Sequence, residues 1–70
     1  MAHLSISPSS NLKDADYDED RRTLTVTFQD GRSYKYSRVD VETAKGLESA
    51  PSSGAFFNSQ VKGRFPHSRV

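Results

Sequence analysis

Apolar and polar residues alternate along two neighbouring segments in the middle of the chain. In residues 23–28 leucine, valine and phenylalanine alternate with threonines, and in residues 33–37 two tyrosines alternate with polar neighbours. A period of two is typical of β-strands that bury one face. Asp30-Gly31 lies between the two segments and favours a tight turn. The sequence therefore predicts a β-hairpin.

Two registers of this hairpin place the tyrosines on different faces of the sheet. With a two-residue loop Thr27 opposes Tyr34, so the tyrosines lie on the threonine side. With a three-residue loop, residues 29–31, Val26 opposes Tyr34, and Gly31 must adopt the left-handed conformation of a G1 bulge. Burying one aromatic side chain removes about 150–250 Å² from water. We favour the bulged register, which puts both tyrosines on the apolar face.

The remaining chain contributes one more strand and two short helices. Residues 11–17 alternate weakly and are read as a first strand. After Asp40, an expected N-cap, the apolar residues recur at helical spacing up to Ala50. A second helix is expected after Ser52 or Ser53, with Gly63 beyond its C-terminal end.

These elements define an α+β fold, a three-stranded antiparallel meander followed by two short helices packed on one face (β-β-β-α-α). Residues 11–70 form a single domain, since a small sheet needs a covering layer. Residues 1–10 are rich in hydroxyl groups and show no period, which predicts a flexible N-terminal arm. The segment around Phe65 is expected to be an extended tail whose ring packs back onto the domain.

Composition narrows the class of protein. Seventy residues, 33% of them hydrophobic, suffice for one small domain with a small core. The chain has no cysteine, which excludes disulfides and thiolate metal sites. No apolar run approaches the ~18 residues of a membrane span. We expect a cytoplasmic monomer without a membrane segment.

The motifs of common catalytic and metal sites are missing or incomplete. His3 and His67 lie near opposite ends of the chain, and neither nucleotide-binding glycine loop occurs. Residues 14–18 read Asp-x-Asp-x-Asp, but Glu19 and Thr25 replace the glycine and glutamate that a calcium loop requires. The sequence therefore predicts no enzyme, no cofactor and no metal ion.

The net charge of +1 conceals an uneven distribution. Acidic residues crowd residues 14–20, and the chain after Glu48 carries only basic charges. Cations interleaved with an aromatic ring can neutralise phosphates while the ring stacks on a base. The candidate nucleic-acid-binding residues are Lys62, Arg64, Arg69, Phe65 and Lys35. A solvated helix end followed by a polar tail is the alternative interpretation.

Several short segments occur in the order and spacing of a known family. They are Ser9-Ser10-Asn11, Tyr34-x-Tyr36, Ala50-Pro51-Ser52-Ser53-Gly54, Phe56-Phe57-Asn58 and Lys62-Gly63-Arg64-Phe65-Pro66. Over residues 6–70 the chain resembles the KTSC domain, named for its occurrence at the C-terminus of some lysyl-tRNA synthetases. The family also includes free-standing bacterial and phage proteins. It often has tyrosine where this chain has Phe56 and Phe65, and another aromatic residue near His67.

The resemblance implies RNA binding only by association with the synthetases. We therefore expect a small non-catalytic module that binds RNA, such as a tRNA-like molecule, through its basic C-terminal end. The alternative is a protein-interaction or regulatory module that docks on a larger complex such as the transcription or translation machinery. In that case the acidic residues 14–20 would contact a basic partner.

Overall fold

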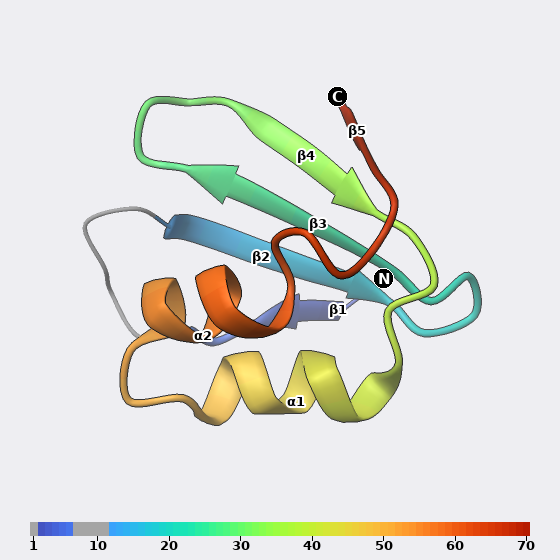
Figure 1. Cartoon of the computed structure of the whole chain (residues 1–70), viewed down its shortest axis with the longest axis horizontal. Helices are drawn as coiled ribbons and strands as arrows, with labels where there is room; N and C mark the ends of the chain where they lie inside the picture. Colours follow the sequence, from blue (N-terminus) through green and yellow to red (C-terminus); the bar gives the residue numbers. More distant parts are fainter. Residues whose placement is uncertain (1, 7–11) are drawn as a thin grey trace.

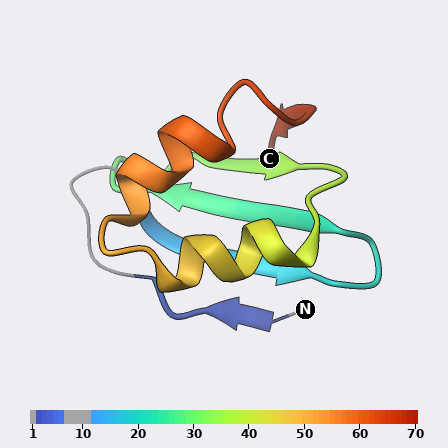
Figure 2. The ribbon, with the colours of Figure 1, turned by 60° about the horizontal axis from the view of Figure 1, so that its bottom comes forward.

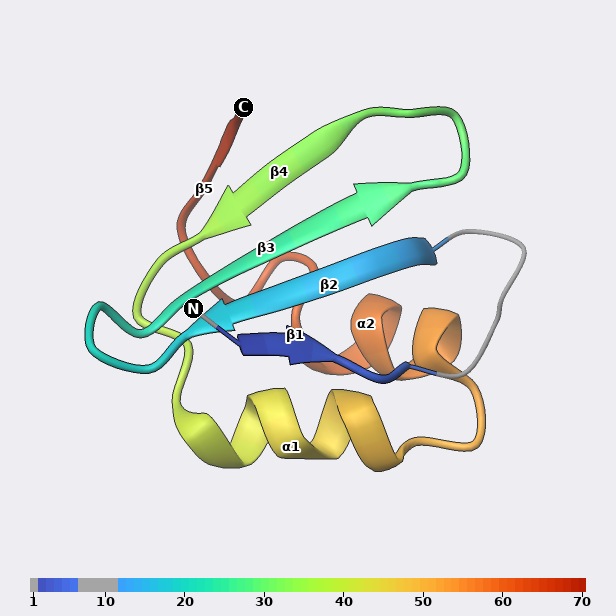
Figure 3. The same cartoon turned by 180° about the vertical axis from the view of Figure 1, so that it is seen from behind.

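A computed structural model describes residues 2–6 and 12–70. Five antiparallel strands form one sheet in the order β1-β2-β3-β4-β5, and both helices lie on the same face (Figure 1). The elements are β1 (Ala2–Leu4), β2 (Leu12–Asp18), β3 (Thr23–Phe28), β4 (Ser33–Tyr36), α1 (Val41–Ser49), α2 (Ser53–Gln60) and β5 (His67–Arg69). Figure 2 shows α1 towards the β2 side of the sheet and α2 towards the β4 side. From behind, the opposite face carries no helix (Figure 3).

The β3–β4 hairpin adopts the predicted bulged register. Val26 pairs with Tyr34, and Leu24 pairs with Tyr36. The Phe28 N–H donates to the Arg32 carbonyl at 2.8 Å, which closes the three-residue loop. Gly31 has a φ of 92°, the left-handed conformation that this loop requires. The prediction that both tyrosines lie on the apolar face is confirmed.

The predicted number of strands was wrong: the sheet has five strands instead of three. The two additional strands, β1 and β5, have three residues each and lie at the two edges of the sheet. Strands this short carry too few residues for alternation to be visible. They form because the neighbouring strand offers unpaired backbone N–H and C=O groups. At the β4–β5 edge, for example, the Ser37 N–H donates to the Pro66 carbonyl. The Val70 N–H donates to the Ser33 carbonyl at the other end of the same pairing.

Strand β1 lies within the segment expected to be a flexible arm. Its Leu4 is 8% exposed and belongs to the hydrophobic core. On the face of the sheet that carries no helix, His3 Nε2 lies 3.0 Å from Asp14 Oδ1, and this hydrogen bond raises the pKa of His3. Flexibility of residues 1–10 stays a prediction, and residues 1 and 7–10 lie outside the described part.

Both helices begin where their N-caps were expected. Asp40, which precedes α1, has an extended backbone and accepts a hydrogen bond from the Thr43 hydroxyl, which lowers the pKa of Asp40. The Ser52 hydroxyl oxygen accepts a hydrogen bond from the Ala55 N–H at 3.3 Å and caps α2. Gly63, with a φ of 80°, lies in the turn after α2 as predicted.

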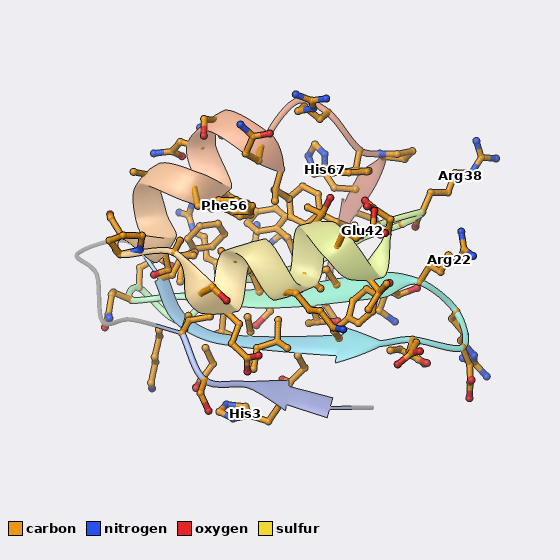
Figure 4. All side chains as sticks on the ribbon, turned by 90° about the horizontal axis from the view of Figure 1, so that it is seen from below. His3, Arg22, Arg38, Glu42, Phe56 and His67 are labelled. Atoms are coloured by element: carbon orange, nitrogen blue, oxygen red, sulfur yellow. The ribbon has the colours of Figure 1, made fainter. Side chains whose placement is uncertain are left out.

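The core fills the space between the sheet and the two helices. Its buried members are Leu4, Leu12, Ala15, Tyr17, Leu24, Val26, Tyr36, Val39, Ala44, Leu47, Phe57 and Val61. The Tyr17 hydroxyl donates to the Val39 carbonyl and so satisfies a buried acceptor. Phe56 packs between the helices, where a Cβ atom on Gly46 would lie only 2.7 Å from the Phe56 ring (Figure 4). The predicted packing of Phe65 against the core is confirmed.

Replacement of Gly31 tests how much the bulged register contributes to stability. Gly31→Ala should lower the free energy of unfolding by about 1–2 kcal/mol, because an L-residue is strained at this φ. No atom lies within 4 Å of an added Cβ, so steric contact contributes nothing. Gly31→Asn, which tolerates the left-handed region better, should lose less. Equal stability of all three proteins in urea titrations would contradict the strain argument.

Candidate functional site

A pocket of about 630 Å³ opens along the β4–β5 edge of the sheet, beside α2. Five of its residues come from the hairpin, two from α2, one from the turn after α2 and one from β5. They are Phe28, Gln29, Asp30, Tyr34, Tyr36, Phe57, Asn58, Lys62 and His67. Its size lies within the range of about 300–1,000 Å³ that is usual for small-ligand sites.

Five aromatic rings in mutual contact form the wall of the pocket. Phe28 meets both Tyr34 and Phe57 edge to face, with ring centroids 5.6 and 5.5 Å apart. Tyr36 meets Phe57 edge to face at 5.4 Å and stacks on His67 at 5.2 Å. Such pairs hold aromatic rings in fixed orientations. The wall is therefore a rigid aromatic surface.

The rings differ in how much surface they leave open. Tyr36 is 4% exposed and Phe57 2%, so the neighbouring rings and the core already cover both. Phe28 and Tyr34 are half-buried, and His67 is exposed. Figure 4 shows His67 on the helix side of the sheet, close to the end of α2. A ligand would thus contact Phe28, Tyr34 and His67, while Tyr36 and Phe57 support them from behind.

The polar residues of the pocket fall into two groups. Asp30 is held by Arg32, whose N–H donates to Oδ1 at 3.0 Å and whose Nε lies 3.5 Å from Oδ2. The Gln29 amide donates to the Leu12 carbonyl at 3.1 Å. The side chains of Asn58 and Lys62, in contrast, are exposed and bond to no residue of the described segments. They are the groups left to bind a polar ligand.

The structure brings some of the predicted nucleic-acid-binding residues together. Lys62 lines the pocket. Arg69 pairs with Tyr34 across β4 and β5, and directly paired residues share a face, so Arg69 lies on the pocket side. Arg64 is exposed in the turn after α2, and Phe65 is half-buried against the core.

Lys35 lies on the other face of the sheet. It pairs with Thr25 on β3 and Ser68 on β5, in the row of polar residues that faces away from the helices. Thr25 lies between Asp16 and Lys35 in this row, and its buried hydroxyl group has no hydrogen-bond partner among the described residues. One flat ligand cannot contact Lys35 and Lys62 together unless it passes around the β5 edge.

Much of the pocket could not be predicted from the sequence. Phe28 was expected only on the apolar face of its strand, and no binding role was predicted for Phe57. The segment after Phe65, which contains His67, was expected to be a tail and not the strand β5. The segment Phe57-Asn58, which contributes to the family resemblance, was the available signal for Asn58. Both tyrosines line the pocket, but the expected core role holds fully only for Tyr36, which is buried, whereas Tyr34 is half-buried and leaves ring surface open.

Fold and pocket together define a small α+β domain with an aromatic pocket along one edge of its sheet. The sequence model of the KTSC domain family matches residues 8–65, and the chain belongs to this family. A crystal structure of a KTSC domain protein from Yersinia pestis has a TM-score of 0.86 and 32% sequence identity to this chain. The match covers 93% of this chain and 92% of that protein.

Relatives of two lengths match the sequence. A lysine–tRNA ligase from Nostoc punctiforme is 38% identical over 56 residues, 80% of this chain. The aligned part is only 10% of that ligase, so the chain spans a small fraction of these relatives. An uncharacterized protein from Stutzerimonas stutzeri is 37% identical over 77% of this chain and 76% of its own length. The domain thus occurs within large proteins and as most of a small one.

The described residues contain neither a candidate metal-binding cluster nor a candidate membrane-spanning helix. No group of three or more histidine, cysteine, aspartate or glutamate side chains is placed to hold a metal ion in residues 2–6 and 12–70. Within the same residues, no helix has the length and apolar character needed to cross a membrane.

Stability at alkaline pH should report the burial of two tyrosines. Burial raises the pKa of Tyr36, with a further contribution from Tyr34, and burial also raises the pKa of Tyr17. The unfolded chain has the ordinary pKa of about 10. The contribution of these two tyrosines to the free energy of unfolding is therefore fully present below pH 10, and it is lost as the pH rises through their folded-state pKa values.

In urea titrations between pH 8 and pH 11.5, Tyr36→Phe should lose less of its free energy of unfolding with rising pH than the unchanged protein. Tyr17→Phe should show the same pH effect, but it should also be less stable at pH 8 because the Val39 carbonyl loses its donor. Parallel pH profiles for all three proteins would show that these tyrosines do not titrate differently in the folded state.

Proposed function

We propose that this domain is a non-catalytic module that binds single-stranded RNA across the pocket. One observation carries the proposal: Lys62 and Arg69 lie on the same side of the sheet as the open aromatic rings of Tyr34 and Phe28. Proteins that bind single strands combine cations for the phosphates with aromatic rings on which bases stack. Both components are present at this edge.

The charge near the pocket supports an anionic ligand. Lys62 and Arg64 follow α2 directly, and Arg69 lies on β5 beside the tyrosines. The carboxylate in the pocket, Asp30, is engaged by Arg32, which reduces its repulsion of phosphates. Three cations contacting phosphates of a single strand predict a slope of about −2 for log affinity against log salt.

The relatives support RNA as the ligand by context. The lysine–tRNA ligases that match this chain are named as enzymes acting on tRNA. Only a small part of each ligase corresponds to this domain, so the ligase activity itself is not transferred to it. An RNA-binding role for this domain, separate from the catalytic part of such a ligase, is consistent with the small share of the ligase that the domain represents.

The proposal predicts a charge-dependent loss of RNA affinity. Lys62→Glu and Arg69→Glu should each weaken binding of a labelled single-stranded RNA about tenfold at ~50 mM salt, which corresponds to about 1.4 kcal/mol. Lys45→Glu is the matched control, because Lys45 is exposed on α1 and does not line the pocket. Fluorescence anisotropy measures the affinities.

The salt dependence gives an independent readout. Lys62→Ala should make the slope of log affinity against log salt shallower by about 0.7, since one phosphate contact is removed. Equal effects of Lys62→Glu and Lys45→Glu would contradict binding at the pocket. A complete absence of binding to RNA and tRNA at ~50 mM salt would remove the function.

A second candidate function is docking to a basic protein partner. The observation in its favour is a hollow of about 380 Å³ lined by Glu19, Asp40 and Glu42 together with Arg22, close to the acidic end of β2. Figure 4 shows Glu42 and Arg22 at this end of the molecule. The negative charge at this end is partly compensated. Arg22 lines the hollow itself, and nearby Arg21 Nε lies 4.0 Å from Asp18 Oδ2. We therefore place protein docking second.

Charge reversal separates the two candidates. If a protein partner binds the acidic end, Glu19→Lys combined with Asp20→Lys should abolish recovery of that partner in an affinity pull-down and leave RNA affinity unchanged or higher. Lys62→Glu should leave the protein interaction intact. Retention of RNA with no protein recovered by the unchanged domain would eliminate the second candidate.

A further inference from the structure

We infer that the aromatic pocket receives one unpaired base of the bound strand, that Asn58 pairs with the edge of this base, and that Lys62 contacts the adjoining phosphate. This inference rests on the proposed RNA binding and names the part of the ligand that the pocket selects. The pocket would then confer base preference, while the exposed arginines contribute affinity without sequence preference.

The aromatic wall suits a flat ligand. Phe28 and Tyr34 hold each other edge to face, and His67 contacts Tyr34 edge to face at 6.0 Å, so these three half-buried or exposed rings surround an open space. Their supporting rings, Tyr36 and Phe57, are buried and fixed. A base stacked here would cover aromatic surface that otherwise contacts water. Such stacking contributes about 5- to 150-fold in affinity per base.

The polar groups suit the edge of a base and its phosphate. Asn58 is on α2, and Lys62 follows four residues later in the turn after the helix, so both project from the same end of α2. An asparagine amide offers a donor beside an acceptor, and its usual bidentate partner among the bases is adenine. The Lys62 ammonium group is a point charge that suits a phosphate.

The charges also disfavour a cationic ligand, which is the main alternative for an aromatic pocket. Aromatic cages commonly bind ammonium groups over the faces of their rings, and negative charge beside the rings would strengthen such binding. Here Lys62 lines the pocket, and Asp30 is paired with Arg32. A cationic ligand would be repelled by Lys62 and only weakly attracted by Asp30. An anionic, planar ligand therefore matches the pocket better.

Titration with nucleotides tests the inference directly. Adding AMP to ¹⁵N-labelled protein should shift the backbone amide signals of Tyr34, Asn58 and His67, and should leave the signal of Lys45 unchanged. AMP should bind at least about fivefold more tightly than CMP, GMP or UMP, the lower limit for one bidentate contact. Asn58→Ala should remove this preference. Gln60→Ala, which removes an exposed amide of the same helix outside the pocket, should retain it.

A second variant addresses stacking. Tyr34→Leu should weaken AMP binding at least about fivefold. Because Tyr34 also contacts the core, its thermal unfolding is compared with that of the unchanged protein, and Asn58→Ala tests the pocket independently of any loss of stability.

The outcomes separate this inference from the proposed function. RNA binding that survives Asn58→Ala and Tyr34→Leu, with no AMP shifts at the pocket, would overturn the base site and leave RNA binding standing. AMP shifts at the pocket with RNA binding no more tightly than AMP would remove the strand-binding function instead. Pocket shifts with a short acidic aromatic peptide, and none with AMP, would assign the pocket to a protein partner and overturn the inference.

Discussion

The left-handed conformation of Gly31 sets the register of the β3–β4 hairpin, and through it the composition of the core and of the pocket. It makes the hairpin loop three residues long, and this length determines that Val26 opposes Tyr34 and Leu24 opposes Tyr36. A shift by one residue would move the tyrosines to the face without helices. The bulge therefore supplies the core with Tyr36 and positions Tyr34 beside α2, where the pocket forms.

The pocket exists because the chain returns to the sheet after α2. The bond from the Ser37 N–H to the Pro66 carbonyl begins the pairing of β5 with β4, and His67 thereby stacks on Tyr36. The same pairing places Arg69 beside Tyr34. Residues that are separated by about thirty positions in the sequence thus form one surface. The sheet contributes four of its five rings, while α2 and the turn after it contribute Phe57, Asn58 and Lys62.

The overall fold is shared within the KTSC domain family. The structural match to the Yersinia pestis protein extends over nearly the whole of both chains. The Tyr34-x-Tyr36 segment, which is prominent in the sequence, serves two purposes. Tyr36 is a buried core residue that supports the pocket wall from behind, and Tyr34 is a half-buried residue that leaves part of its ring open in that wall.

The β3–β4 hairpin, both helices with their N-cap positions and the α+β class could be predicted from the sequence, whereas the bulged register was favoured only because it buries the tyrosines. The predicted elements depend on alternation, turn chemistry and capping, which neighbouring residues specify. The strands β1 and β5 could not be predicted, because three-residue strands form by pairing to an edge that the rest of the fold provides. The same edge pairing places His67 and Arg69 beside the aromatic pocket, while Lys35 faces away from it.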